Sequence, residues 1–319
     1  MKILVTGGCG FIGSNFIRYI AAKYPTYKIT NLDKLTYAGN LENLKDIAHL
    51  KNYNFIKGDI CDENVVDKLA KVNDVVINFA AESHVDRSIK NSRDFLRTNV
   101  HGVDVILGAV RNNKIKRYIQ ISTDEVYGSI LFGSAKEEDA LKPNSPYAAS
   151  KASADLLCRA YFKTFNLPVI ITRSSNNFGP YQYPEKVIPL FITNLLENKK
   201  VPLYGDGLNE RDWLFVLDNV RAIDLVLHKG KIGQIYNIGI GKEIANLKLT
   251  KILLDSLGKT KKMVKYVVDR LGHDRRYSID NKKIVKLGWQ PNYDFQTAIS
   301  LTIRWYKENK SWWKKFKKS

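Results

Sequence analysis

Gly7-Gly8-Cys9-Gly10-Phe11-Ile12-Gly13 is the stretch of sequence that decides the fold. It lies between a short apolar, β-branched run, Lys2–Val5, and a helical pattern over Ile12–Tyr24. Its glycines at 7, 10 and 13 have the spacing G-x-x-G-x-x-G. Where a strand turns into a helix, such glycines permit a tight turn and a close approach of the backbone to a pyrophosphate, and the helix N-terminus favours the anion. The stretch predicts a dinucleotide-binding site at the start of the chain.

Short apolar runs and helical patterns alternate through the first half of the chain. The predicted strands are Lys2–Val5, Ile29–Leu32, Tyr53–Ile56, Val75–Phe79, Arg117–Ser122 and Val169–Thr172. The predicted helices between them are Ile12–Tyr24, Asn64–Ala70, Leu96–Asn112 and Ala148–Phe165. Such alternation favours a parallel sheet with helices on both faces. We therefore expect an α/β fold, a Rossmann-type doubly wound parallel sheet.

The chain changes character after about Ser174, where prolines recur and aromatic and charged residues interleave. This change indicates a smaller, interleaved C-terminal substrate-binding region that loops from the sheet supply. The apolar run Ile235–Ile238 again has the pattern of a strand. We predict a dinucleotide-binding domain over 1–177 and a mainly substrate-binding region over 178–319, with about 213–240 returning to the main sheet.

Composition narrows the class of protein. Hydrophobic residues make up 44% of the 319, which is enough for a sizeable core. No run approaches the roughly 20 apolar residues that a membrane span needs, and the first residues lack the features of a signal peptide. The cysteines at 9, 61 and 158 are scattered and lack metal-ligand spacing. We expect a cytoplasmic protein with reduced thiols and no bound metal.

Basic residues concentrate near the C-terminus. Residues 251–319 carry 18 Lys and Arg against 6 Asp and Glu, and the excess peaks in the aromatic tail Lys307–Ser319. Such a tail can contact nucleic acid or an acidic membrane surface. We favour the alternative, in which lysines solvate the surface and attract a diphosphate substrate. In an enzyme of that kind, removal of Trp312–Ser319 is expected to leave turnover intact.

An acidic residue follows the second predicted strand at the position that selects between dinucleotides. Asp33 lies 20 residues beyond Gly13. A carboxylate there accepts both ribose hydroxyls and repels a 2′-phosphate, which favours NAD over NADP. Lys34 follows at once and weakens that discrimination. Asp59-Ile60, after the third strand, is placed to bracket the adenine ring.

Tyr147 and Lys151 lie four residues apart, on one face of a predicted helix. A free tyrosine, with a pKa near about 10, is a poor base at neutral pH. An adjacent ammonium and a positive nicotinamide would stabilise the phenolate, so that it takes a hydroxyl proton near pH 7. The same lysine can bind the nicotinamide ribose.

With these motifs in place, the chain resembles the extended short-chain dehydrogenase/reductase family from Met1 to about Tyr306. Within that family, Ile121-Ser122-Thr123-Asp124-Glu125-Val126-Tyr127-Gly128 resembles the nucleotide-sugar 4,6-dehydratases, because epimerases and decarboxylases usually carry small residues in place of Asp124-Glu125. Two positions depart from the expected pattern, Asn219 in place of a histidine and Leu271 in place of a proline.

The resemblance implies a reaction on a nucleotide-diphosphate sugar, with dTDP-glucose favoured. Tyr147 removes the C4 hydroxyl proton as hydride passes from C4 to NAD. Glu125 then abstracts the C5 proton, protonated Asp124 donates to the departing C6 hydroxyl, and NADH returns hydride to C6. Adjacent carboxylates can perform opposite roles when their environments separate their pKa values.

The resemblance also assigns further residues. The catalytic set is Asp124, Glu125, Tyr147, Lys151 and Thr123. The cofactor-binding set is Gly7, Gly10, Phe11, Ile12, Gly13, Asp33, Lys34, Leu35, Thr36, Asp59, Ile60, Ala80, Ala81, Ser83, Thr98, Tyr147, Lys151 and Asn177. The substrate-binding set is His84, Thr123, Asn176, Lys186, Val187, Pro202, Leu203, Tyr204, Arg211, Asn246, Arg270 and His273.

Two other interpretations remain open. One is a UDP-sugar 4-epimerase or decarboxylase, against which Asp124-Glu125 argues. The other is a non-catalytic NAD-binding module that docks through its basic tail, against which the Tyr147–Lys151 pair argues. The family usually pairs protomers through a four-helix interface, so we expect a homodimer; apolar positions in Leu96–Val110 and Ala154–Phe165 fit either that interface or burial against the sheet.

Overall fold

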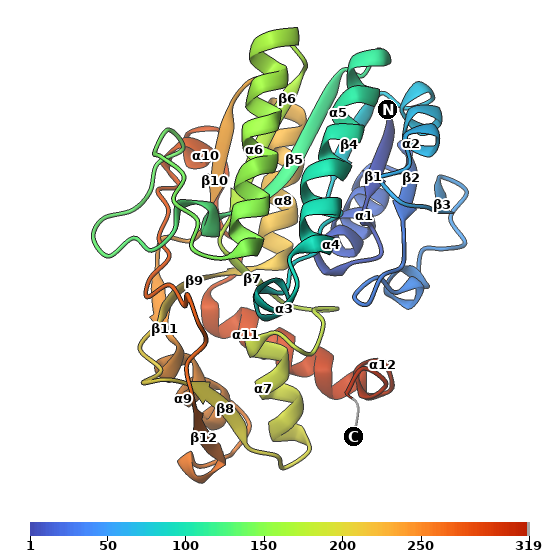
Figure 1. The fold of residues 1–319 in the computed structure, drawn as a ribbon. Helices are drawn as coiled ribbons and strands as arrows, with labels where there is room; N and C mark the ends of the chain where they lie inside the picture. The colour runs from blue at the N-terminus through green and yellow to red at the C-terminus, as the bar shows by residue number, and fades with distance from the viewer. Residues whose placement is uncertain (318–319) are drawn as a thin grey trace.

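A seven-stranded parallel sheet is the centre of the computed structural model, which describes residues 1–317 (Figure 1). The strands lie in the order β10-β6-β5-β4-β1-β2-β3. Their bounds are β1 Lys2–Thr6, β2 Lys28–Asp33, β3 Tyr53–Lys57, β4 Val75–Asn78, β5 Arg117–Thr123, β6 Val169–Ser174 and β10 Ile235–Ile238. The strand order reverses between β1 and β4, and in such sheets ligands bind beyond the carboxyl ends of the strands at that point.

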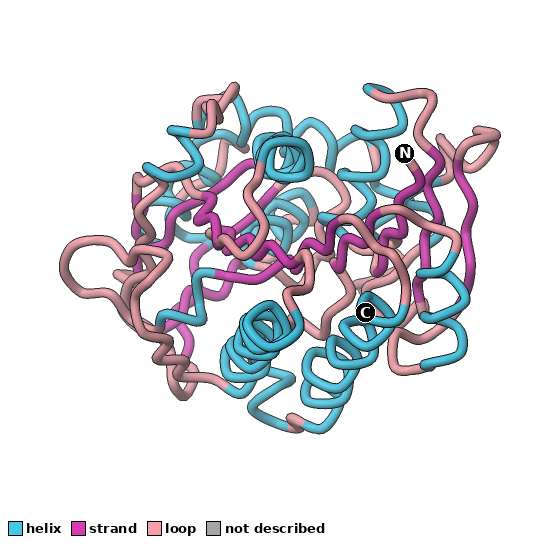
Figure 2. The backbone as a smooth tube through the Cα atoms, turned by 90° about the horizontal axis from the view of Figure 1, so that it is seen from above, coloured by secondary structure: helices cyan, strands magenta, loops and turns pink. Residues whose placement is uncertain are grey.

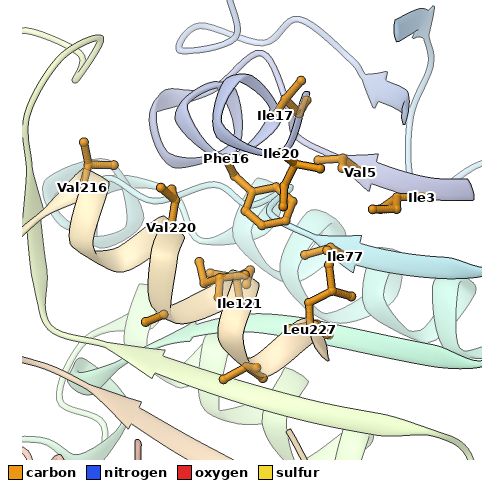
Figure 3. Packing of buried hydrophobic residues seen from close by; sticks show 14 of the residues in the cluster. Ile3, Val5, Phe16, Ile17, Ile20, Ile77, Ile121, Val216, Val220 and Leu227 are labelled. Carbon is orange, nitrogen blue, oxygen red and sulfur yellow. The ribbon is translucent and has the colours of Figure 1, made fainter. Parts of the chain in front are cut away.

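Helices cover both faces of this sheet (Figure 2). One face carries α1 (Phe11–Lys23), α8 (Val216–Lys229) and α10 (Lys282–Lys286), and the other carries α2 (Glu63–Lys71), α5 (Gly102–Asn112) and α6 (Pro146–Phe165). On the first face, Phe16 and Ile20 of α1 lie among Val220 of α8 and the strand residue Ile77 (Figure 3). Each of these side chains is fully buried, so the glycine-rich turn that precedes α1 is anchored by a well-packed helix.

A second, smaller region lies below the carboxyl ends of the strands (Figure 1). Its sheets are β11-β9-β7 and the parallel pair β8 and β12. Its elements are β7 Asn176–Phe178, α7 Val187–Leu196, β8 Val201–Tyr204, β9 Glu210–Phe215, β11 Glu243–Ala245, α9 Asn246–Ser256, η4 Lys261–Met263, β12 Val264–Val267, α11 Phe295–Glu308 and α12 Lys310–Lys314. These elements share a separate aromatic core.

The expected α/β, doubly wound fold is confirmed. The bounds of the six strands and four helices predicted for the first half agree with the observed bounds to within two residues. One of these helices differs in geometry. The helix expected over Leu96–Asn112 begins with the π-helical segment η2 (Leu96–His101), which follows α3 (Val85–Lys90) and α4 (Arg93–Phe95). The run Ile235–Ile238 pairs with β6 in the main sheet, whereas β9 belongs to the smaller sheet. The division at residue 177 stays a prediction.

The basic tail differs from expectation. Trp312 and Trp313 of α12 are 7% and 1% exposed and pack in the aromatic core of the smaller region. Removal of residues from Trp312 onwards would therefore expose that core, which argues against the expectation that such a deletion leaves turnover intact. Lys318 and Ser319, the last residues of the predicted tail, lie outside the described residues. Within 1–317, no helix has the length and apolarity that a membrane crossing requires.

Candidate active site

A pocket opens at the carboxyl ends of β1, β2, β4 and β5, where the strand order reverses. It gathers nearly all of the predicted cofactor set. The predicted residues that line it are Gly7, Gly10, Phe11, Ile12, Gly13, Asp33, Lys34, Thr36, Asp59, Ile60, Ala80, Ala81, Ser83, Thr98, Tyr147, Lys151 and Lys186. Two predicted members do not line it. Leu35 packs against the core beside α1, and the Asn177 side chain donates to the Ser175 carbonyl.

The glycines of the turn fit a bound dinucleotide. A Cβ added at Gly7 would lie 2.4 Å from the Ala80 nitrogen, and one at Gly13 would lie 2.5 Å from the Gly7 carbonyl oxygen. These two glycines hold β1, β4 and α1 together, and Gly7 also has a φ of +69° that suits glycine. Gly10 is different, because a Cβ there would meet only the Gly7 oxygen, at 3.3 Å, and would otherwise project toward the pocket. Its missing side chain therefore leaves room for a ligand at the N-terminus of α1.

Asp33 is placed at the rim of the turn as the sequence predicts. Its carboxylate accepts hydrogen bonds from the Cys9 and Leu35 backbone N–H groups, both at 2.8 Å, and each oxygen keeps acceptor capacity for a ribose hydroxyl. Burial raises the pKa of Asp33 above its usual value. Lys34 lies 2.9 Å from Asp59, so its charge is paired with a carboxylate. Because its charge is paired, Lys34 attracts a 2′-phosphate less strongly, and the preference of Asp33 for NAD is largely kept.

Tyr147 and Lys151 occupy the first turns of α6, which Ser145 caps through its hydroxyl and which Pro146 begins. The Lys151 ammonium is buried and donates to the Ile121 carbonyl of β5 at 2.6 Å. Burial lowers the pKa of Lys151 to about 8, although Asp155 one turn further along raises it. Burial, reinforced by the charges of Glu125 and Asp124, raises the pKa of Tyr147 well above its usual value. The phenol therefore needs a nearby positive charge before it can act as a base.

Asp124 and Glu125 begin the short helix η3 (Asp124–Tyr127), directly beyond β5. The Thr123 hydroxyl caps this helix by accepting from the Glu125 N–H, and it donates to Asp124 at 3.2 Å. Burial, with the charge of Glu125, raises the pKa of Asp124 far above its usual value. Burial also raises the pKa of Glu125, but Arg270, Lys186 and Arg211 oppose the rise. Asp124 Oδ2 and Glu125 Oε2 have no hydrogen-bond partner among the described residues. Each of these oxygens is therefore available to bond to a ligand.

Three cations of the predicted substrate set lie around Glu125. Lys186 donates to the Ser83 carbonyl at 2.8 Å, Arg270 lies 3.7 Å from Asp86, and Arg211 donates to the Asp274 carbonyl at 2.8 Å. Arg211 is 4% exposed and lies over the Tyr277 ring. Among residues 1–317, none of the three has a carboxylate partner closer than the 3.7 Å of Arg270 and Asp86, which leaves their charges available to a diphosphate.

The remaining predicted substrate residues are distributed around these cations. His84 caps α3 and lies 3.6 Å from Glu185, while His273 pairs with Asp269 at 2.6 Å and lies edge-on to Tyr204. Buried oxygens of Asn176 and Asn246 have no partner among the described residues. Leu203 is buried beneath Gly207, Pro202 is half-buried beside it in β8, and Val187 packs against the aromatic core. Of the two departures from the family pattern, Asn219 is buried and accepts from Ser174, and Leu271 is 78% exposed.

Sequence reasoning missed one side of the pocket. The additional lining residues are Leu32, Tyr37, Ala38, Gly39, Gly58, Phe79, Glu82, Ile121, Ser122, Tyr181, Gln182, Tyr183 and Glu185. Arg87 joins this side by stacking over the Tyr37 ring at 3.8 Å and by pairing with Glu185 at 3.0 Å. The aromatic pattern Tyr181-Gln182-Tyr183 between prolines 180 and 184 was the available signal. Among residues 1–317, no cluster of three or more His, Cys, Asp or Glu side chains is arranged to hold a metal ion.

Fold and site together define an enzyme of the extended short-chain dehydrogenase/reductase class. A model of the family described as GDP-mannose 4,6 dehydratase matches residues 4–302, and the chain belongs to this family. The dTDP-glucose 4,6-dehydratase of Streptomyces niveus is 50% identical over 322 residues, which cover 99% of this chain and 96% of that protein.

Solved structures agree with this assignment. The dTDP-glucose 4,6-dehydratase DesIV of Streptomyces venezuelae, solved with NAD bound, is 50% identical, with a TM-score of 0.97 and coverage of 99% of this chain and 100% of its own. The UDP-glucose 4-epimerase of Thermotoga maritima is 29% identical, with a TM-score of 0.90 and coverage of 97% and 99%. The expected family is confirmed, and the fold alone does not separate dehydratase from epimerase.

We predict that Gly13→Ala weakens dinucleotide binding at least about tenfold, because the new methyl group collides with the Gly7 carbonyl and displaces the turn. Gly108→Ala in α5 is the matched control, since nothing lies within 4 Å of its added Cβ. The control should bind normally and gain up to about 1 kcal/mol of helix stability. Isothermal titration calorimetry of each folded variant with NAD measures the difference in dinucleotide affinity. Equal affinities would contradict this account of the turn.

Lys151 also makes a prediction about pH. Its folded pKa of about 8 lies below its usual 10.5, so between these pH values the unfolded chain binds the proton and the folded chain does not. The contribution of this residue to stability therefore rises with pH across that window and is constant below it. The free energy of unfolding of the wild type, minus that of Lys151→Met, should increase by about 2–4 kcal/mol from pH 7.5 to 10.5. Urea unfolding at several pH values measures it, and a constant difference would refute the shift.

Proposed function

We propose that this chain is an NAD-dependent lyase that converts dTDP-glucose to dTDP-4-keto-6-deoxyglucose. The observation that carries the proposal is the adjacent pair of buried Asp124 and half-buried Glu125 beside Tyr147. One oxygen of each carboxylate lacks a partner among the described residues. Simple oxidation and reduction at one carbon need no such pair, whereas elimination of water needs both an acid and a base. The activities of the relatives support the same reaction.

NAD fits the residues that line the pocket, from the glycine-rich turn to Asp33 and Lys151. When bound, NAD supplies an acceptor for hydride from C4 of the sugar and returns that hydride at C6. Tyr147 takes the proton of the C4 hydroxyl. Lys151 holds a positive charge within the same buried site, which stabilises the phenolate that this step requires.

The two carboxylates act at C5 and C6. Burial and the charge of Glu125 raise the pKa of Asp124 well above its usual value, although Arg211 and the Thr123 hydroxyl oppose the rise. Asp124 is therefore assigned as the acid that donates a proton to the leaving C6 hydroxyl. Glu125 lies among three cations that favour its charged form, so it removes the C5 proton. Thr123 positions both groups by capping η3.

Lys186, Arg211 and Arg270 are proposed to bind the diphosphate, since they present buried or half-buried cations next to the carboxylates. Tyr204 and His273 are placed further out, where the ring of each can contact the base. The side chains of Asn176 and Asn246 are proposed to bind the sugar nucleotide through oxygens that have no partner among the described residues. His84, whose Nε2 lies 3.6 Å from Glu185, is proposed to join them.

A UDP-sugar 4-epimerase is the second candidate, because epimerases share this fold at TM-scores of 0.90 and above. The carboxylate pair argues against it. The non-catalytic alternative, a module that docks through its tail, is less well supported, because the tail tryptophans are buried in the protein and not available to a partner. A cytoplasmic location remains our proposal, supported by three cysteines that form no disulfide.

We predict that the wild type, incubated with NAD and dTDP-glucose, yields a sugar nucleotide lighter by one water, with no net build-up of NADH. Glu125→Gln should lower the yield about 100-fold or more, since it removes the base. Reduced cofactor should accumulate in that variant, because oxidation at C4 does not need Glu125. Mass spectrometry and absorbance at the NADH band measure the two effects.

The controls for this experiment are Glu138→Gln, an exposed glutamate that should retain full activity, and Tyr147→Phe, which should show neither product nor reduced cofactor. A product of unchanged mass but new stereochemistry would refute the dehydratase and favour the epimerase. Faster turnover of UDP-glucose than of dTDP-glucose would change the proposed base.

We also propose that the protein is a homodimer through α5 and α6. Most apolar residues of α5 are buried in the protein, but Leu96 of the preceding η2 is 52% exposed, and Leu156 and Phe165 of α6 are 56% and 41% exposed. Leu156→Glu should shift the protein toward the monomer in analytical ultracentrifugation. Val285→Glu on α10 replaces an apolar residue that is 42% exposed on the opposite face of the sheet. This control variant should sediment like the wild type. A wild type that sediments as a monomer would refute the dimer.

A further inference from the structure

The aromatic tail that the proposed reaction leaves unused contacts both sides of the cofactor pocket. In Figure 1, α11 and α12 run beneath the main sheet toward the side that holds β1, β2 and β3. One contact is with the turn that carries the glycines. The other is with Tyr181–Lys186, the segment between β7 and α7 that covers the opposite side of the pocket.

The contact with the glycine-rich turn passes through one asparagine. The Trp312 indole N–H donates to Asn43 Oδ1 at 2.8 Å, and the Asn43 amide donates to the Cys9 carbonyl at 2.8 Å. All three residues are buried. The Cys9 N–H in turn donates to Asp33. A continuous chain of hydrogen bonds therefore joins α12 to the residues expected to hold the pyrophosphate and the ribose.

A second contact supports this one at the surface. Lys315 forms an ion pair with Glu42, one residue before Asn43. Arg18 donates to the Asn43 carbonyl at 2.5 Å and stacks over the Tyr181 ring at 4.5 Å. Arg18 thus lies between the two parts of the pocket wall that α12 contacts.

The segment Tyr181–Lys186 needs such support because its backbone is strained. Tyr181 has a φ of +66°, which is a rare conformation for a bulky residue and persists only where its surroundings impose it. Its ring lies 4.7 Å from that of Trp305 and 6.0 Å from that of Trp312. The Tyr306 hydroxyl donates to the Gln182 carbonyl at 2.5 Å.

The same segment is held at its other end. The Tyr183 ring packs against Phe316 at 5.0 Å and edge-on to Tyr37, another residue of the pocket wall. Glu185 pairs with Arg87, and Lys186 donates to Ser83. Tail residues therefore brace the back of a segment whose front faces the cofactor.

We propose that Trp312 is a positioning residue that, through Asn43 and the rings around it, fixes the glycine-rich turn and the segment Tyr181–Lys186 around the dinucleotide and so slows its release. This inference rests on the proposed function. In that reaction the hydride taken from C4 returns to C6 of the same sugar, so the reduced cofactor must stay bound until water has left. The contacts of Trp312 with Asn43 and Tyr181, which we call the clasp, slow the loss of the reduced cofactor during that interval.

The experiment compares two neighbouring tryptophans in the full-length protein. Trp312→Phe removes the bond to Asn43 and keeps an aromatic ring. Trp313→Phe is the matched control, because the Trp313 indole N–H donates to the Tyr306 carbonyl of α11 at 2.8 Å and not to Asn43. Each variant loses one buried indole hydrogen bond, and thermal unfolding should show similar destabilisation of both.

The measurement is the rate of NADH release, followed by fluorescence after a chase with excess NAD and without any sugar nucleotide. Trp312→Phe should release NADH about three- to tenfold faster, the effect of one net hydrogen bond. Trp313→Phe should stay within about twofold of the wild type. Asn43→Ser should match Trp312→Phe, and the double variant should be no faster than either, since the two residues share one path.

Equal release from the wild type and Trp312→Phe would overturn the proposal, as would equal acceleration in Trp312→Phe and Trp313→Phe, which would mean a general loosening of the tail. If Trp312→Phe does not fold, Asn43→Ser decides alone. Absence of NADH binding by the wild type would instead count against the proposed function. A failed dehydration assay with normal NADH release would leave the clasp standing.

Discussion

The close contact between the glycine-rich turn and the end of β4 is the constraint on which the rest of the structure depends. Gly7 lies so near Ala80 that no side chain fits between them. This contact directs α1 against the sheet and places the Cys9 backbone where it bonds to Asp33 on one side and to Asn43 on the other. The pocket, the position of the carboxylate proposed to bind the ribose and the link to the tail all follow from the path of seven residues.

The burial of charge just beyond β5 is the second constraint. Burying a carboxylate is costly unless cations or hydrogen bonds compensate it. Asp124 and Glu125 lie side by side, and the compensation is unequal, since the cations favour Glu125. UDP-glucose 4-epimerases share this fold, so the fold alone does not determine the reaction. We infer that the reaction depends on which side chains stand at the end of β5.

The sequence predicted those features that depend on short separations along the chain. The glycine turn, Asp33 and the Tyr147–Lys151 pair each follow from spacing within one strand, turn or helix, and their placement matches. The tail is different, because Trp312 and Asn43 are 269 positions apart and no local pattern joins them. The tail therefore read as a solvated, basic segment, although its three aromatic residues, Trp312, Trp313 and Phe316, are buried or half-buried. The strained conformation of Tyr181 depends on Trp305 and Trp312 in the same way.

The long-range contacts and the local motifs serve one requirement. An enzyme that uses its dinucleotide as a temporary store of hydride must bind it more persistently than one that exchanges it at each turnover. Glycines and one carboxylate provide recognition, but they leave one wall of the pocket to a loop with a strained residue. A loop of this kind keeps a single conformation only where tertiary packing imposes it. The C-terminal helices supply that packing, so a segment remote from the chemistry contributes to how long the cofactor stays.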